Sequence, residues 1–298
     1  MTIREILNEG TKKLKAPQIN SVIDTPALDA TLLLAHSLQI RREDLILREN
    51  EKMDKVAAKI FFDYINRRMG GECIAYILGR KEFRAMDFMV NPHVLVPRPD
   101  TEIIVETVIE YIDSLTALHE EGKNGLSLLD LCTGSGAIGI SIKKERPLLA
   151  ITASDISPEA LRVAKDNAAK LLKFKTEERE AGVDFILSDL FEKIDGKFNI
   201  IVSNPPYIRT DDFSSLAPEV HREPALALDG GRDGLDKIKK IITHAPDYLK
   251  QGGRLFLEAA PEQMPAISNF FSENGYCNIM LHKDLGSRER VISASLMP

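Results

Sequence analysis

The chain opens with a helical pattern. In most of the first seventy positions, apolar residues recur every three or four residues, as amphipathic helices require. One predicted helix runs from Pro26 to Leu38, with Thr25 as a candidate N-cap and proline at the first helical position. A second runs from about Glu51 to Met69 and places four apolar residues on one face: Met53, Val56, Ile60 and Tyr64. We expect a small helical bundle.

The pattern changes after this helical region. Residues 76–100 hold short runs in which apolar and polar residues alternate, with a turn signal at Asn91-Pro92, and this predicts a β-hairpin that links two domains. The helical period returns in residues 101–118. We therefore expect three parts: a helical domain in 1–75, a hairpin linker in 76–100 and a larger domain in 101–298.

In the larger domain, strand and helix patterns alternate. Predicted strands are 127–131, 150–154, 184–188, 198–203 and 254–258, and predicted helices are 137–146, 157–173, 234–250 and 262–274. Alternation of this kind with strongly apolar strands is typical of an α/β fold whose parallel sheet is covered on both faces. The tail differs, because residues 278–283 and 290–296 flank a turn without a helix and predict an antiparallel hairpin. The charged run 173–180 is interpreted as a solvated helix end or loop.

Composition excludes several classes of protein. Hydrophobic residues make up 44% and charged residues 28%, as in ordinary globular proteins. The net charge of −6 argues against a protein whose main task is to grip nucleic-acid backbone. No apolar run is long enough to cross a bilayer, and no secretory signal is visible at the start. The three cysteines lie far apart without a CxxC pair, so we expect a cytoplasmic protein with no metal site.

A glycine-rich turn follows the first predicted strand of the larger domain. Gly134, Gly136 and Gly139 form G-x-G-x-x-G between a strand and a helix, where glycines allow a sharp turn close to a ligand. Asp155 ends the next strand, where a carboxylate can accept both hydroxyls of a ribose, although it could instead cap the following helix. Asp130 is a candidate for the cofactor's amino group. The motif favours an adenosine-containing cofactor and leaves a nicotinamide dinucleotide and S-adenosylmethionine open.

A second motif ends the strand at 198–203. Asn204-Pro205-Pro206-Tyr207 falls at the C-terminal edge of the predicted sheet, where open α/β proteins place their chemistry. Prolines lack a backbone donor and leave their carbonyls free, and Asn204 adds a side-chain carbonyl. Two rigid acceptors suit an –NH2 group, whose nitrogen they would orient toward an electrophilic methyl group, while Tyr207 offers a flat surface. In isolation the tetrapeptide would indicate only a rigid turn.

Together these motifs resemble the class I, S-adenosylmethionine-dependent amino-methyltransferases. More narrowly, the chain resembles the bacterial peptide chain release factor N5-glutamine methyltransferase family almost end to end. The resemblance is carried by the tetrapeptide, the turn and six further segments: PALDATLLLAHSL (26–38), RRMGGECIAYILGRKEF (67–83), VLVPRPDTE (94–102), SDLF (188–191), EVHREPALALDGGRDGL (219–235) and KDLGSRERVI (283–292). It implies a Rossmann-like class I methyltransferase sheet with the helical domain docking the substrate.

The resemblance also implies a function and a site. The function is transfer of a methyl group from S-adenosylmethionine to the glutamine side-chain amide of the Gly-Gly-Gln loop in class I release factors, in translation termination. The residues implied to bind the cofactor are Cys132, Thr133, Gly134, Ser135, Gly136, Asp155, Asp189, Leu190 and Asn204. Those implied to hold the glutamine and carry catalysis are Asn204, Pro205, Pro206 and Tyr207, with Glu223-Pro224 in the loop that shapes the target pocket. Release factors are the expected partner, without direct nucleic-acid or membrane binding.

The sequence departs from the family pattern at three places, and it leaves three alternative functions to consider. Cys132 stands where the family usually has glycine, Asn199 replaces an acidic residue, and Glu258-Ala259-Ala260 replaces the common Glu-Ile-Gly. One rival is a nucleic-acid amino-methyltransferase, which the negative charge weakens because such enzymes must grip a backbone while they extract a base. Another is a nicotinamide-dependent oxidoreductase, which would have no use for paired acceptors at Asn204-Pro205. A third is a catalytically silent binding module.

Overall fold

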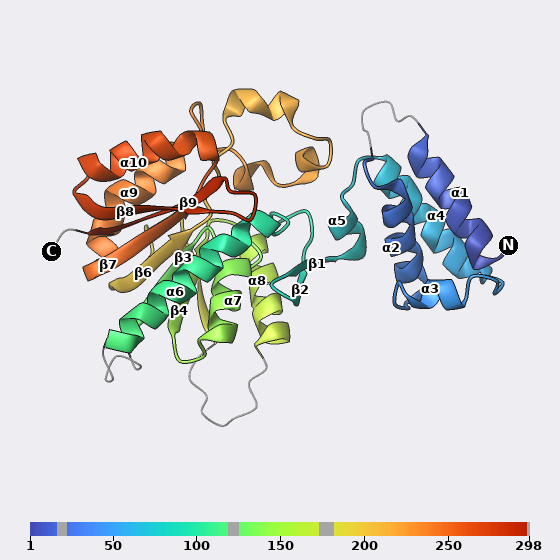
Figure 1. The fold of residues 1–298 in the computed structure, drawn as a ribbon, viewed down its shortest axis with the longest axis horizontal. Helices are drawn as coiled ribbons and strands as arrows, with labels where there is room; N and C mark the ends of the chain where they lie inside the picture. Colours follow the sequence, from blue (N-terminus) through green and yellow to red (C-terminus); the bar gives the residue numbers. More distant parts are fainter. Residues whose placement is uncertain (17–22, 119–124, 173–181, 297–298) are drawn as a thin grey trace. The chain divides into compact units, whose positions relative to one another are not determined.

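The computed structural model describes residues 1–16, 23–118, 125–172 and 182–296 (Figure 1). The chain forms two compact units. The first, here the helical unit, comprises residues 1–80 and 215–222, and the second, here the sheet unit, comprises residues 81–214 and 223–298. The chain therefore leaves the sheet unit after Ser214 and returns to it at Glu223. The predicted run 173–180 lies outside the described residues.

The helical unit contains α1 (Ile3–Lys15), α2 (Pro26–Leu38), α3 (Asp44–Leu47), α4 (Lys55–Met69) and α5 (Ile74–Leu78). The predicted bundle is therefore present, but its second helix begins later than expected. It begins at Lys55 because the Asp54 carboxylate accepts hydrogen bonds from the N–H groups of Val56 and Ala57. Thr25 is the N-cap of α2, but its hydroxyl donates to Asp29 instead of accepting from the helix.

The apolar face predicted for the second helix is only partly buried: Met53 and Tyr64 pack against the core of the unit. Val56 is 67% exposed and Ile60 is also exposed, whereas Phe61, Ile65 and Arg68 are buried. The core of the unit combines these two apolar side chains with residues of α1 and α2, including Ile6, Leu33 and Leu34. Because α4 carries apolar residues on two faces, its period alone does not show which face packs inward.

The linker region contains a hairpin, as predicted, but the hairpin occupies only residues 80–89 and turns before the Asn91-Pro92 signal, and residues 76–78 belong to α5. Strands β1 (Arg80–Phe83) and β2 (Met86–Met89) form a two-stranded sheet, joined by Arg84 and Ala85. Both turn residues have positive φ, as the tightest hairpin turns require. Phe83 and Phe88 are buried in the core of the sheet unit. The chain then continues through a short 3₁₀ turn, η1 (Pro99–Thr101), into α6 (Glu102–Leu118).

A seven-stranded sheet organises the sheet unit, in the order β5-β4-β3-β6-β7-β9-β8. Its strands are β3 (Ser127–Leu131), β4 (Ala150–Asp155), β5 (Val183–Leu187), β6 (Phe198–Ser203), β7 (Leu249–Glu258), β8 (Tyr276–Lys283) and β9 (Glu289–Leu296). All neighbouring pairs from β5 to β7 are parallel, and β9 runs antiparallel to both β7 and β8. The predicted α/β sheet with an antiparallel C-terminal hairpin is thus confirmed.

Helices cover both faces of this sheet. Helices α6, α7 (Ala137–Glu145) and α8 (Pro158–Leu171) lie on one face, and α9 (Asp236–Tyr248) and α10 (Met264–Glu273) lie on the other (Figure 1). Successive side chains of a strand point to opposite faces of the sheet, so the sheet has a hydrophobic core on each face. Leu128 packs with α6 and α7, whereas Leu129 and Leu131 pack with α9 and α10. No helix among the described residues combines the length and apolar character needed to cross a membrane.

Candidate active site

The strand order brings the predicted site residues to one edge of the sheet. Strands β4 and β5 are added on one side of β3, and β6 and β7 on the other side. The strand order therefore reverses between β3 and β6, which makes this the topological switch point of the sheet. Open α/β sheets bind their ligands at such a point, beyond the carboxyl ends of the strands.

The register places four side chains in a row at this edge. Leu131 pairs with Ser154 of β4 and with Ser203 of β6, and Ser203 pairs in turn with Leu257 of β7. The next residue on each strand therefore gives the order Asp155, Cys132, Asn204 and Glu258. Sequence reasoning singled out the first three for a site, and it noted Glu258 only as part of a departure from the family pattern.

The glycine turn after β3 is held by Asp130, which is fully buried. Its Oδ2 accepts from the Thr133 hydroxyl at 2.6 Å and from the Gly139 N–H at 3.0 Å. Burial raises the pKa of this carboxyl to about 7, although both donors act to lower it. Asp130 does not line the cavity described below and braces the turn, and its contact with a cofactor amino group, directly or through water, stays a prediction.

Asp155 faces the same turn from β4. Its Oδ2 accepts from the Gly134 N–H at 2.8 Å and its Oδ1 accepts from the Ser157 N–H at 2.9 Å. Burial raises the pKa of Asp155, and these backbone donors act in the opposite direction. The N-cap of α8 is Ser157, whose hydroxyl accepts from Ala160, so helix capping does not explain the position of Asp155. Its carboxylate lines the cavity.

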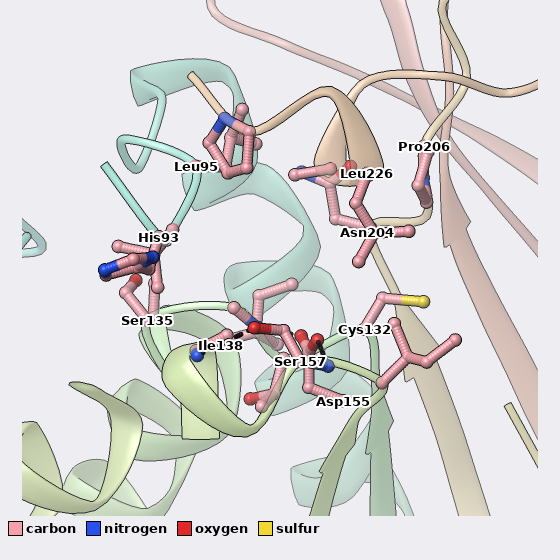
Figure 2. A pocket seen from close by; sticks show the side chains of 18 of the residues that line it. His93, Leu95, Cys132, Ser135, Ile138, Asp155, Ser157, Asn204, Pro206 and Leu226 are labelled. Atoms are coloured by element: carbon pink, nitrogen blue, oxygen red, sulfur yellow. Dashed lines mark hydrogen bonds between the residues drawn. The ribbon is translucent and has the colours of Figure 1, made fainter. Parts of the chain in front are cut away.

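A cavity opens at this edge (Figure 2). Figure 2 shows Asp155 and Ser157 toward one end of it and Asn204, Pro206 and Leu226 toward the other. The cavity is lined by eight of the nine residues that the resemblance assigns to the cofactor: Cys132, Thr133, Gly134, Ser135, Asp155, Asp189, Leu190 and Asn204. Asp189 also forms an ion pair with Lys237, another lining residue, at 3.5 Å.

Four predicted site residues do not line this cavity: Gly136, Pro205, Tyr207 and Glu223. Gly136 is the N-cap of α7, where its φ of 82° suits glycine. Tyr207 packs against the core under α9 and α10, and its carbonyl accepts from Gln263. The sequence predicted that the Tyr207 ring would offer a flat surface to the substrate, but the ring does not line the cavity. Pro205 is buried beside Pro206, which does line it.

Glu223 acts from behind the cavity wall. This buried carboxylate accepts from the Val96 N–H at 3.1 Å and is paired with the guanidinium of Arg98. It thereby fastens the end of the linker to the loop that contributes Pro224, Leu226 and Ala227 to the cavity. The prediction that Glu223 belongs to the loop shaping the pocket agrees with this position, and its direct contact with a substrate stays a prediction.

Sequence reasoning did not assign the linker to the site. Five of its residues, His93, Val94, Leu95, Pro97 and Arg98, line the cavity, as does Thr101 just after it. It also missed Asn167 of α8, a fully buried side chain that donates to the carbonyls of Met89 and Ser135 and accepts from the Met89 N–H. Asn167 thus ties the glycine turn to the hairpin. No local pattern marks these residues, because the contacts join segments that lie far apart in the sequence.

Cys132 occupies the left-handed region with a φ of 58°, so the chain tolerates a side chain where glycine is the usual choice. Burial and the nearby Asp155 carboxylate raise the pKa of its thiol to about 12. The thiol is therefore a neutral part of the wall at neutral pH. Within the described residues, no group of three His, Cys, Asp or Glu side chains could hold a metal ion.

Comparison with known families and proteins agrees with this architecture. Residues 5–79 match the family model of the PrmC N-terminal domain, and residues 114–274 match that of the methyltransferase small domain. The release factor glutamine methyltransferase of Clostridium acetobutylicum is 40% identical over 270 residues, which cover 89% of this chain and 90% of that protein. The chain belongs to the release factor glutamine methyltransferase family.

Two further comparisons concern a longer relative and a more distant structure. A bifunctional methyltransferase of Rickettsia bellii is 37% identical over 99% of this chain, but the chain spans only 55% of that longer protein. A methyltransferase structure from Pyrococcus furiosus matches with a TM-score of 0.52 and 18% identity, covering 72% of this chain and 91% of that one. At that identity the structural likeness shows the methyltransferase fold and no more.

The cavity fits the cofactor of this family, S-adenosylmethionine. A carboxylate at the end of β4 can accept from ribose hydroxyls, and a Cβ built on Gly134 would meet no atom within 4 Å, so this side of the turn is open. Ile138, Ile156 and Leu190 add apolar lining for a flat base. Donors, acceptors and apolar surface are thus all present in one cavity.

Proposed function

We propose that this protein transfers a methyl group from S-adenosylmethionine to the side-chain amide nitrogen of the glutamine in the Gly-Gly-Gln loop of class I release factors. Family membership supports the substrate, and the juxtaposition of Asp155, the glycine turn and Asn204 at one sheet edge supports the chemistry. The single observation that carries the proposal is that Asn204-Pro205-Pro206 leaves β6 directly beside the glycine turn that leaves β3.

The cofactor is assigned to the residues nearest the turn. Asp155 would accept from the ribose hydroxyls, Asp189 and Leu190 would flank the adenine, and residues 132–135 would approach the rest of the molecule with their backbone. When bound, S-adenosylmethionine supplies the methyl group as a substituent of a positively charged sulfonium. The carboxylates that line the cavity favour this charge.

The target amide is assigned to the segment after β6. An amide nitrogen is a poor nucleophile because its lone pair is delocalised into the carbonyl group. The side-chain oxygen of Asn204 and the backbone carbonyl of Pro205, which lies between the lining residues Asn204 and Pro206, would each accept one hydrogen of the glutamine –NH2 group. These two bonds orient the nitrogen toward the methyl group and disperse positive charge as it develops. The methylated nitrogen becomes strongly acidic, so it can lose its proton without a strong general base.

We further propose that the helical unit docks the release factor. Four apolar side chains of α3 and α4 are exposed in the described part of this unit: Ile46, Leu47, Val56 and Ile60. Leu47 is 85% exposed, and exposed apolar residues of this kind are typical of protein-binding surfaces. Leu47→Ser should therefore impair methylation of whole release factor more than methylation of a short Gly-Gly-Gln peptide. Equal effects on both substrates would contradict docking by this surface.

The experiment for the main proposal is mass spectrometry of a release factor incubated with the protein and S-adenosylmethionine. We expect a gain of one methyl group on the loop glutamine, and Asn204→Ala should lower the rate by at least ~10²-fold while the affinity for S-adenosylmethionine changes less than about tenfold. A parallel incubation with total nucleic acid tests the rival substrate class. Methyl transfer to nucleic acid alone would overturn the proposal, and so would an Asn204→Ala variant with normal turnover.

A further inference from the structure

The amide of Asn204 has two faces that differ chemically, and the proposed function needs only one of them to point into the cavity. Its oxygen can accept from a substrate –NH2 group, whereas its nitrogen carries only donors and would repel that group. Asn204 lines the cavity at the end of β6 (Figure 2). A mechanism that holds this amide in one orientation is therefore part of the site.

Thr101 supplies such a mechanism. This buried residue ends the 3₁₀ turn before α6 and lines the same cavity. Its hydroxyl donates to Oε1 of Glu258 at 3.2 Å, and it accepts from Nδ2 of Asn204 at 3.3 Å. A threonine hydroxyl has one hydrogen. That hydrogen is directed to Oε1 of Glu258, so the hydroxyl accepts from Asn204 and the Asn204 atom that faces it is the nitrogen. A Glu258 carboxyl protonated on Oε2 keeps the same arrangement.

Glu258 fixes the direction of this chain of hydrogen bonds. It is the residue that follows Leu257 on β7, next to Asn204 in the row at the sheet edge, and it is 1% exposed. Oε2, its second carboxyl oxygen, has no hydrogen-bond partner within the described residues, so the group retains unused capacity to accept. A buried acceptor of this kind holds the Thr101 hydroxyl because leaving it unpaired would cost free energy.

We infer that Thr101 and Glu258 are positioning residues that hold the Asn204 side chain with its nitrogen toward them and its oxygen toward the substrate. Neither residue needs to touch the reacting atoms. The inference rests on the proposed function for its catalytic consequence, but the orientation of the amide is a property of the protein alone. It predicts that loss of the Thr101 hydroxyl impairs the chemical step and leaves cofactor binding intact.

The test compares Thr101→Val, which removes the hydroxyl at nearly constant volume, with Thr101→Ser, which keeps it. Thr101→Ala is a second variant that cannot overpack the site. We expect kcat for methylation of a Gly-Gly-Gln peptide to fall ~10-fold in Thr101→Val and Thr101→Ala, as for the loss of one hydrogen bond, with KM for S-adenosylmethionine unchanged. Thr101→Ser should stay within about twofold of the wild type.

A second readout needs no activity. The side-chain amide signals of Asn204 in a ¹⁵N spectrum are identified by their loss in Asn204→Ala. We expect solvent exchange of these hydrogens to be about tenfold faster in Thr101→Val than in the wild type or Thr101→Ser, as when one hydrogen bond is lost. A wild type without methylation activity but with this exchange pattern would refute the function and support the positioning. Normal turnover and unchanged exchange in Thr101→Val would overturn the positioning.

Discussion

Two glycines of the turn after β3 should respond in opposite ways to the same substitution. Gly136 has a φ of 82°, and a Cβ on it would lie 2.5 Å from Cδ1 of Ile140 and 3.3 Å from Cβ of Ala164. Gly134 has a φ of 55°, but a Cβ there would meet nothing within 4 Å. Left-handed backbone costs an alanine about 1–2 kcal/mol at either position, and overpacking adds about 1–3 kcal/mol at Gly136 alone.

Gly136→Ala should therefore lower the free energy of unfolding by about 2–5 kcal/mol and Gly134→Ala by about 1–2 kcal/mol. Because the chain has no tryptophan, urea unfolding is followed by far-ultraviolet circular dichroism. Calorimetric titration with S-adenosylmethionine should show the reverse order, since only Gly134 lines the cavity and its new methyl group would enter it. Equal losses of stability, or normal cofactor affinity in Gly134→Ala, would refute this reasoning.

Three further predictions concern buried charge and reactivity. Burial raises the pKa of Glu258 from 4.5 to about 7, so its protonated carboxyl stabilises the fold fully below pH 4.5, and this stabilisation is lost as the pH rises through 7. Glutamine does not titrate. Between those pH values, the free energy of unfolding of Glu258→Gln should therefore rise by on the order of 3 kcal/mol relative to wild type, as measured by urea unfolding at each pH. Arg68→Met should cost about 3–5 kcal/mol because it leaves the buried Asp29 unpaired, whereas Arg67→Met, at an exposed ion pair, should cost under about 1 kcal/mol in the same assay. Cys132, whose pKa is raised to about 12 by burial, should resist iodoacetamide at pH 8 until urea unfolds the chain, and peptide mass spectrometry that finds it alkylated in the native protein would contradict this.

Sequence reasoning predicted the sheet well because each strand carries its own signal. Residues 127–131 and 198–203 are strands with the predicted bounds, since near-continuous apolar runs between turn residues leave little choice of structure. The helical unit was harder to predict. Phe61 and Ile65 lie on one face of α4 and Val56 and Ile60 on another, and only the neighbouring helices decide which face is buried.

The site was predictable where strands end and unpredictable where loops meet. Asp155 ends one strand of the sheet and Asn204 follows another, so the topology alone places both at the cavity. By contrast, Arg68 of α4 binds Glu219 at 2.6 Å across 151 residues of sequence, within the helical unit. Glu223 reaches Val96 across 127 residues within the sheet unit. Spacing carries no information about such contacts, because each depends on where the intervening elements pack.

The strands and the buried polar side chains position different parts of the site. The strand register fixes the order of Asp155, Cys132 and Asn204 to within one residue, but a strand end does not fix the direction of the loop that leaves it. Buried polar side chains do so here: Asp130 and Asn167 hold the glycine turn, and Glu223 holds the linker. Each binds backbone N–H or carbonyl groups of a segment far from it in the sequence or next to the cavity. The loops are therefore held in place by contacts within the protein itself, as an active site that relies on positioned dipoles requires.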